Sequence, residues 1–289
     1  MSDRSFGNGR LLITCPDQPG IVAAISDFLH QHGANIIHSA QHTNDPEGGR
    51  FFMRVVFSIS PYPDKFHQVK EEFLPIAEHF DMEWSLERED RKKSVAIFIS
   101  KEDHCLTELL WRWRSGELPI HISCVISNHT TLKNVVESYE IPFYHIPIEK
   151  DAKPEAENKI LRTLEQYPID FLVLARYMQI LSPDFVAHYP AKIINIHHSF
   201  LPAFIGANPY RQAFERGVKL IGATAHYVTN DLDEGPIIEQ DVLRVNHQYN
   251  ANDLKITGRN AEKIALARAV TWHAEDRVIV DDNKTIVFL

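Results

Sequence analysis

Cysteine is scarce in this chain, and its few cysteines form no pattern. Cys15, Cys105 and Cys124 are the only three in 289 residues, and no C-x-x-C spacing occurs. A disulfide framework or a thiolate zinc site needs paired or closely spaced cysteines. The sequence therefore indicates a reduced protein, for which we expect a cytoplasmic location and no metal site.

Long apolar runs and an excess of basic charge are also missing. The N-terminus, MSDRSFGNGR, is polar without an apolar signal core, and no run is long enough to span a bilayer. The chain has 30 basic and 39 acidic residues, a formal net charge of −9, whereas binding DNA or tRNA requires a basic surface. We expect neither a membrane nor a nucleic acid as a partner.

Several well-known active-site motifs are absent as well. The chain has no G-x-S-x-G, no G-x-G-x-x-G after a strand, no G-x-x-x-x-G-K-[ST] and no H-E-x-x-H. A serine hydrolase, a dinucleotide site and a nucleoside triphosphate site are therefore unsupported. What is present is apolar material for two packed cores, since hydrophobic residues make up 44% of the sequence.

The first part of the chain alternates strands and helices in the order βαββαβ. Apolar residues recur at three- and four-residue steps in 17–33, which indicates a helix, and Gly33 is a plausible stop. The predicted elements are strands at 9–16, 34–43, 50–60 and 81–88, and helices at 17–33 and 63–80. We expect a small α+β domain over residues 1–88 with one exposed sheet face, followed by a charged linker at 89–93.

The rest of the chain predicts an α/β domain over residues 94–289. Near-continuous apolar runs, typical of parallel strands covered on both faces, lie at 94–100, 120–127, 170–176 and 191–199. Helical stretches lie between these runs, and two antiparallel strands (218–229, 235–245), a helix (251–275) and a terminal hairpin follow. The fold class is an open, mostly parallel, Rossmann-like sheet.

The stretch INIHHSFLP ends one of these strands with a group of polar side chains. In a strand, Asn195 and His197 share one face and His198 points to the other, so the two histidines are poor ligands for one metal ion. A second stretch, VTNDLDEGP, offers Asp233 after another strand. An amide, an imidazole and a carboxylate together suit attack on a carbonyl group. The alternative is that these residues only cap a strand and a turn.

Two longer stretches, INIHHSFLPAFIGANPYRQAFERG and GATAHYVTNDLDEGPIIEQ, resemble the formyltetrahydrofolate-dependent formyl-transfer family over residues 94 to 289. The resemblance implies that Asn195, His197 and Asp233 form the catalytic triad, and that the folate is a substrate with no cofactor required. The segment LARYMQILSP matches the family's pteridine-binding segment. The implied folate-binding residues are Met178, Gln179, Ile180, Leu181, His226 and Asn230.

The N-terminal stretch LLITCPDQPGIVAAISDFLHQHGANI resembles an ACT regulatory domain. The resemblance implies an amino-acid effector near Asp17, Gly20 and Asn35 at a subunit contact, and hence a homo-oligomer; a purely structural module is the alternative. An ACT domain before a formyl-transfer domain resembles the deformylases that hydrolyse 10-formyltetrahydrofolate. Such an enzyme supplies formate and free tetrahydrofolate to one-carbon metabolism and purine biosynthesis.

The turn SKEDHC bears on whether water or an amine accepts the formyl group. Transferases that act on glycinamide ribonucleotide have a glycine-rich turn there that binds phosphate, whereas this turn has no glycine and carries Glu102 and Asp103. We expect these charges to repel a phosphate, which favours water. The alternatives are a formyltransferase with a small amine acceptor and an inactive amino-acid sensor; a tRNA formyltransferase fits the acidic charge poorly.

Overall fold

The computed structural model describes residues 5–45, 47–149, 152–203 and 209–289. The chain forms two compact units: one contains the chain up to Lys92 with Glu275–Ile279 and Ile286–Leu289, and the other contains Lys93–Ala274 and Val280–Thr285. Two C-terminal stretches thus pack with the N-terminal unit, whereas the sequence analysis assigned all of 94–289 to one domain. None of the helices in the described ranges combines the length and apolar character needed to cross a membrane.

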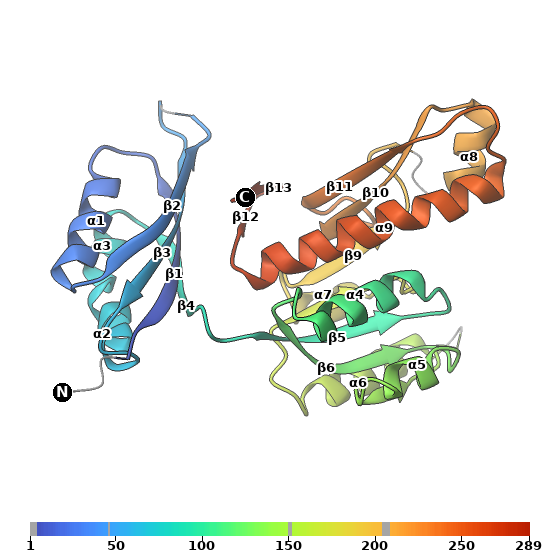
Figure 1. Ribbon diagram of the computed structural model, residues 1–289, viewed down its shortest axis with the longest axis horizontal. Helices are drawn as coiled ribbons and strands as arrows, with labels where there is room; N and C mark the ends of the chain where they lie inside the picture. Colours follow the sequence, from blue (N-terminus) through green and yellow to red (C-terminus); the bar gives the residue numbers. More distant parts are fainter. Residues whose placement is uncertain (1–4, 46, 150–151, 204–208) are drawn as a thin grey trace. The chain divides into compact units, whose positions relative to one another are not determined.

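The N-terminal unit is a four-stranded antiparallel sheet with helices packed on one face (Figure 1). Its strand order is β2-β3-β1-β4, so β2 and β4 form the edges. The predicted βαββαβ order is correct, except that the second helix divides in two. The elements are β1 (Gly7–Pro16), α1 (Ile21–Gln31), β2 (Asn35–Thr43), β3 (Arg50–Ile59), α2 (Asp64–Glu72), α3 (Leu74–His79) and β4 (Glu83–Arg88).

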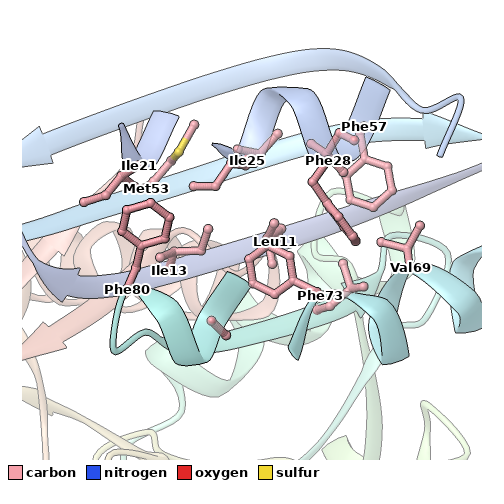
Figure 2. Packing of buried hydrophobic residues seen from close by; sticks show 14 of the residues in the cluster. Leu11, Ile13, Ile21, Ile25, Phe28, Met53, Phe57, Val69, Phe73 and Phe80 are labelled. Atoms are coloured by element: carbon pink, nitrogen blue, oxygen red, sulfur yellow. The ribbon is translucent and has the colours of Figure 1, made fainter. Parts of the chain in front are cut away.

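The core of this unit lies between the sheet and the helices (Figure 2). Leu11 and Ile13 alternate along β1 and point into this core, where Ile25 of α1 and Phe73 after α2 pack against them. Gly20 directly precedes α1 and has a φ of 98°, a left-handed backbone conformation that residues with a side chain rarely adopt. The apolar stripe of this helix consists of Ile21, Val22, Ile25, Phe28 and Leu29, and all of these except Val22 are buried.

The opposite face of this sheet is not simply exposed, as the sequence analysis expected. Arg10 and Arg54 alternate with core residues and are 7% and 4% exposed. Arg10 Nη1 lies 3.3 Å from Asp276 Oδ2, and Arg54 donates to the carbonyl oxygens of Glu275 and Asp276 at 2.9 and 2.8 Å. The C-terminal stretch covers these arginines, a contact too distant in sequence for local periodicity to predict.

The second unit contains a seven-stranded sheet of order β11-β10-β9-β8-β5-β6-β7 (Figure 1). The strands from β9 to β7 are parallel, and β10 and β11 are antiparallel additions. The elements up to the fifth parallel strand are β5 (Lys93–Ile99), α4 (His104–Ser115), β6 (Ile120–Ser127), α5 (Lys133–Glu137), β7 (Phe143–His145), α6 (Lys153–Leu164), β8 (Phe171–Leu174), α7 (Pro183–Ala187) and β9 (Ile193–His197). The remaining elements of this unit are α8 (Pro209–Arg216), β10 (Leu220–Tyr227), β11 (Ile237–Arg244) and α9 (Ala251–Ala274). β12 (Val278–Asp281) and β13 (Lys284–Val287) form a separate two-stranded sheet, with residues assigned to each of the two units.

The apolar runs predicted as parallel strands are buried as expected. Phe98, Leu172 and Ile193 are fully enclosed in one cluster with residues of α6 and α7. Two elements were not predicted: the three-residue strand β7 and the helix α8, whose few buried positions give little apolar signal. Residues 204–208, within the longer quoted stretch INIHHSFLPAFIGANPYRQAFERG, lie outside the described residues.

Candidate active site

One cavity of about 380 Å³ brings together every catalytic and folate-binding residue predicted from the sequence. Its volume is in the range of small-molecule sites. Asn195 and His197 of β9 line it, as do Met178, Ile180 and Asp233 from the neighbouring loops. Met178, Ile180 and Leu232 are 58%, 61% and 58% exposed, which is unusual for apolar side chains gathered at one cavity. The remaining predicted residues of the lining are Gln179, Leu181, His226 and Asn230.

The loop 228–236 carries the carboxylate to the histidine by a route that the sequence analysis did not anticipate. Because β10 runs antiparallel to β9, with Tyr227 opposite Ile194, β10 ends beside the start of β9 rather than beside its end. The loop then folds back toward His226. Gly235 permits this return, because a Cβ there would clash with the carbonyl of Tyr227. Convergence of the three groups was predicted correctly, but they do not meet through adjacent carboxyl ends of strands.

His197 and Asp233 form the central pair of this cavity. Nδ1 of His197 lies 3.1 Å from Oδ2 of Asp233, and His197 is 6% exposed. Burial alone would raise the pKa of Asp233, but its bonds to His197 and His226 outweigh this and hold the pKa well below its ordinary value. Among the described residues, Nε2 of His197 is buried without a hydrogen-bond partner. The pair therefore presents one imidazole nitrogen to a ligand while an ionised carboxylate orients the ring.

His226 orients the amide of Asn195. Its Nδ1–H donates to the carbonyl oxygen of Tyr227 at 2.9 Å, which fixes the ring with Nε2 toward Asn195 and Asp233. Nδ2 of Asn195 lies 3.2 Å from that nitrogen, and Oδ1 of Asp233 lies 3.6 Å from it. His226 thus lies close to both Asn195 and Asp233, and the folate contact predicted for it stays a prediction.

His198 does not point away from the site as strand alternation predicted. It lines the cavity, and its ring centroid lies 5.2 Å from that of His197. The reason is that β9 ends at His197, so alternation no longer applies to the next residue. Burial, reinforced by nearby Arg176, lowers the pKa of His198 to about 4, so the ring is neutral near pH 7.

Two residues that shape the site were not identified from the sequence. Ser100 ends the β5 segment; its hydroxyl donates to Oδ1 of Asn128 at 2.7 Å and accepts from the backbone N–H of Met178 at 3.0 Å. Arg176 lines the cavity after β8 with a φ of 64°. Polar residues directly after two apolar strands were the available signal for both.

The turn at Glu102 differs from the expectation in one respect. Glu102 is not a free negative charge, because Lys255 and Arg259 of α9 contact its carboxylate at 2.9 and 2.7 Å. The hydrogen bond from Lys255 lowers the pKa of Glu102. The predicted repulsion of a phosphate stays a prediction, but its source is a paired carboxylate that also occupies two cations an anion would otherwise use.

One group of possible metal ligands occurs in the described part of the chain: His104, Cys105 and Glu262, whose ligand atoms lie within 4.8 Å of one another. The carboxylate of Glu262 already accepts from His104 Nε2 at 2.8 Å and from the Tyr210 hydroxyl at 2.7 Å. Burial raises the pKa of Cys105 well above its ordinary value, so the thiol stays protonated. These residues form a hydrogen-bonded ion-pair network rather than a suitable metal site.

The predicted effector residues lie at two ends of the N-terminal sheet: Asp17 and Gly20 follow the end of β1, whereas Asn35 pairs with Ser58, which also pairs with Asn8 near the start of β1. Asp17 accepts a hydrogen bond from Thr43 Oγ1 at 2.8 Å, and its backbone N–H donates to Gly49 at 2.9 Å. Gly20 precedes α1 with open space where a Cβ would lie, and Asn35 begins the exposed edge strand β2. The structure contains no feature among the described residues that identifies a ligand there.

Comparison with known proteins decides the family. The chain matches the formyl transferase family model over residues 93–270 and the ACT domain model over residues 9–65. A formyltetrahydrofolate deformylase of Bacillus subtilis is 60% identical over 99% of this chain and 95% of that protein. The chain belongs to the formyltetrahydrofolate deformylase family.

Solved structures agree with the family assignment over both units. A formyltetrahydrofolate deformylase structure from Pseudomonas syringae aligns with 100% of this chain and with 96% of the deformylase chain, at 47% identity and a TM-score of 0.94. The structure of glycinamide ribonucleotide transformylase 1 of Symbiobacterium toebii aligns with only 68% of this chain and with 95% of the transformylase chain, at 28% identity and a TM-score of 0.65. The deformylase family is therefore distinguished by likeness over the whole chain.

Proposed function

We propose that the chain hydrolyses 10-formyltetrahydrofolate to tetrahydrofolate and formate. The observation that carries this proposal is the single cavity in which Asn195 and the His197–Asp233 pair meet. The full-length likeness to proteins named formyltetrahydrofolate deformylase supports it. No metal or cofactor enters the proposed chemistry, because the three side chains and water supply every group that the reaction needs.

The reaction begins with attack of water on the formyl carbon. Asp233, with its lowered pKa, is a weak base, so Nε2 of His197 accepts the water proton and the ionised Asp233 stabilises the resulting imidazolium. Asn195 donates a hydrogen bond to the oxyanion of the tetrahedral adduct. His197 then returns the proton to N10 as the C–N10 bond breaks. The products are tetrahydrofolate and formic acid, which ionises to formate and a proton.

The folate is held by the loop after β8 and by the loop after β10. Met178, Ile180 and Leu181 supply apolar contacts for a flat ring, and the hydrogen bond from Met178 N–H to Ser100 fixes this loop. Gln179 and Asn230 supply amides for its polar edge. His226 takes part indirectly, by holding Asn195 in place.

A single assay tests the proposal: purified full-length protein is given 10-formyltetrahydrofolate, and formate and tetrahydrofolate are measured. Formate release at a turnover rate that His197→Ala reduces by about a hundredfold or more is the expected result. Addition of glycinamide ribonucleotide separates the first rival function, because a small-amine formyltransferase would form formylated ribonucleotide in its place. Absence of any turnover would favour an inactive amino-acid sensor.

We further propose that the enzyme is a homo-oligomer and that it binds an amino acid at a subunit contact, between Asp17 and Gly20 of one subunit and Asn35 of another. The match to the ACT domain model and the exposed β2 edge support both points. The cysteines are free and buried, in keeping with a cytoplasmic location. Calorimetric titration of the apo enzyme with each amino acid tests the effector site, and Asn35→Ala should abolish any binding found.

A further inference from the structure

One buried cation in the wall of the cavity has no part in the proposed reaction. Arg176 is 9% exposed and lines the cavity beside His197 and His198. It forms one ion pair, Nε to Oε2 of Glu262 at 3.4 Å, and no hydrogen bond with any described residue. Its Nε is buried without a hydrogen bond, and its two terminal amino groups have no hydrogen-bond acceptor among the described residues, so the guanidinium has donors to offer a ligand in the cavity.

The surroundings of Glu262 explain why its carboxylate does not satisfy Arg176. Its Oε1 accepts from the hydroxyl of Tyr210, and its Oε2 accepts from His104 Nε2. Gly258, one turn before Glu262 on α9, lets Tyr210 approach closely, since a Cβ there would clash with the tyrosine. A guanidinium has five N–H donors, and an ion pair through Nε leaves both terminal amino groups available.

Charge in the cavity indicates which kind of ligand suits this position. Asp231 and Asp233 both line the cavity, and Arg176 is the one arginine or lysine among its described lining residues. A product anion formed beside these carboxylates would be repelled unless a cation offset them. The planar fork of a guanidinium matches the two oxygens of a carboxylate.

We propose that Arg176 binds formate, as a carboxylate-recognition residue for the product of the reaction. This inference rests on the proposed function. Leu174, the last residue of β8, pairs with Asn195 of the parallel strand β9. Arg176, two residues after Leu174, therefore lies next to His197, two residues after Asn195. The formyl carbon reacts there, and its two oxygens after hydrolysis form the carboxylate.

The test measures inhibition of hydrolysis by added sodium formate, together with formate binding by calorimetry in the absence of folate. Wild-type protein should bind formate and be inhibited by it. Arg176→Gln should weaken both effects by about tenfold or more, as expected for a charge-assisted hydrogen bond. Arg176→Lys should fall between the two, because it keeps the charge but loses the fork. Arg211→Gln, an exposed arginine of α8 paired with Glu215, is the matched control and should behave as wild type.

Each outcome separates the inference from the function on which it rests. If wild type releases formate but Arg176→Gln binds formate equally well, the inference is wrong and the proposed function stands. If Arg176→Gln loses affinity for tetrahydrofolate but not for tetrahydropteroate, which lacks the glutamate, the guanidinium binds the glutamate of the folate. That result would also overturn the proposal that Arg176 binds formate. If Arg176→Gln does not fold, the double variant with Glu262→Gln removes both charges and takes its place. A wild type without formate release would contradict the proposed function itself.

Discussion

Asp233 lies with Oδ2 3.1 Å from Nδ1 of His197, and its backbone adopts a left-handed conformation with a φ of 58°. A non-glycine residue in this region is uncommon, and Asp is among those that tolerate it best. The loop that ends at Gly235 holds Asp233 in this conformation against His226 and His197. The strain and the carboxylate position are therefore consequences of one loop geometry.

Replacement of Asp233 by Asn should separate chemistry from binding. Asn tolerates the same backbone conformation but cannot stabilise the imidazolium of His197, so we expect turnover to fall by about a hundredfold or more. Folate binding should persist, because Met178, Ile180 and Leu181 are unchanged. Formate release and calorimetry measure the two effects. Glu234→Gln, the exposed neighbour, is the control; near-normal turnover in Asp233→Asn would reduce Asp233 to a turn residue.

Gly258→Ala should destabilise the protein, which is the reverse of the usual effect in a helix. Glycine inside a helix ordinarily costs about 1 kcal/mol relative to alanine. Here the added methyl would displace Tyr210 from Glu262, and we expect a loss of about 1–3 kcal/mol from overpacking. Urea unfolding measures the change. Asn260→Ala on the exposed face of the same helix should be neutral or slightly stabilising, and equal behaviour of the two variants would contradict the packing argument.

Asp276→Asn should weaken the N-terminal unit although it lies near the other end of the chain. The substitution keeps the left-handed backbone at φ 54° but removes the charge that Arg10 contacts at 3.3 Å. Both side chains are 8% exposed, so we expect a loss of about 1–3 kcal/mol in free energy of unfolding. Asp282→Asn, an exposed aspartate with φ 51°, is the matched control. Identical unfolding curves for the two variants would show that the buried pair contributes nothing.

The sequence predicted the site better than it predicted the charges around it. The strand pattern drew attention to Asn195, His197 and Asp233 but left a capping role open. Their catalytic roles came from the resemblance to the formyl-transfer family and stay a prediction. The partners of Glu102 and Arg176 could not be found in this way. These partners, Lys255, Arg259 and Glu262, all lie on α9, far along the chain, and ion pairing between distant elements leaves no periodic trace in a single sequence.

The same limit applies to the fold. Buried strands such as β5 and β8 were predicted from continuous apolar runs. The return of residues 275–279 to the N-terminal unit depends on Arg10 and Arg54, which look like surface residues of an amphipathic strand until their partners are known. The path of the loop after β10 likewise depends on the antiparallel register of that strand, which its composition does not specify.

The exposed edge of the N-terminal sheet leads to the last prediction, that this unit pairs subunits. β2 pairs only with β3 among the described strands, and it carries Ile36 and Ile37 at 37% and 54% exposure. An apolar edge strand with unpaired backbone groups favours association with another copy.

Removal of residues 1–93 would be a poor test of this pairing, because it strips residues 275–279 of their partners. Ile37→Lys instead places a charge on the edge and should reduce the oligomer to a smaller species in light scattering at micromolar concentration. Val22→Lys, an exposed apolar residue of α1 in the same unit, should leave the mass unchanged. A wild-type monomer, or an Ile37→Lys protein of unaltered mass, would exclude β2 as the subunit contact.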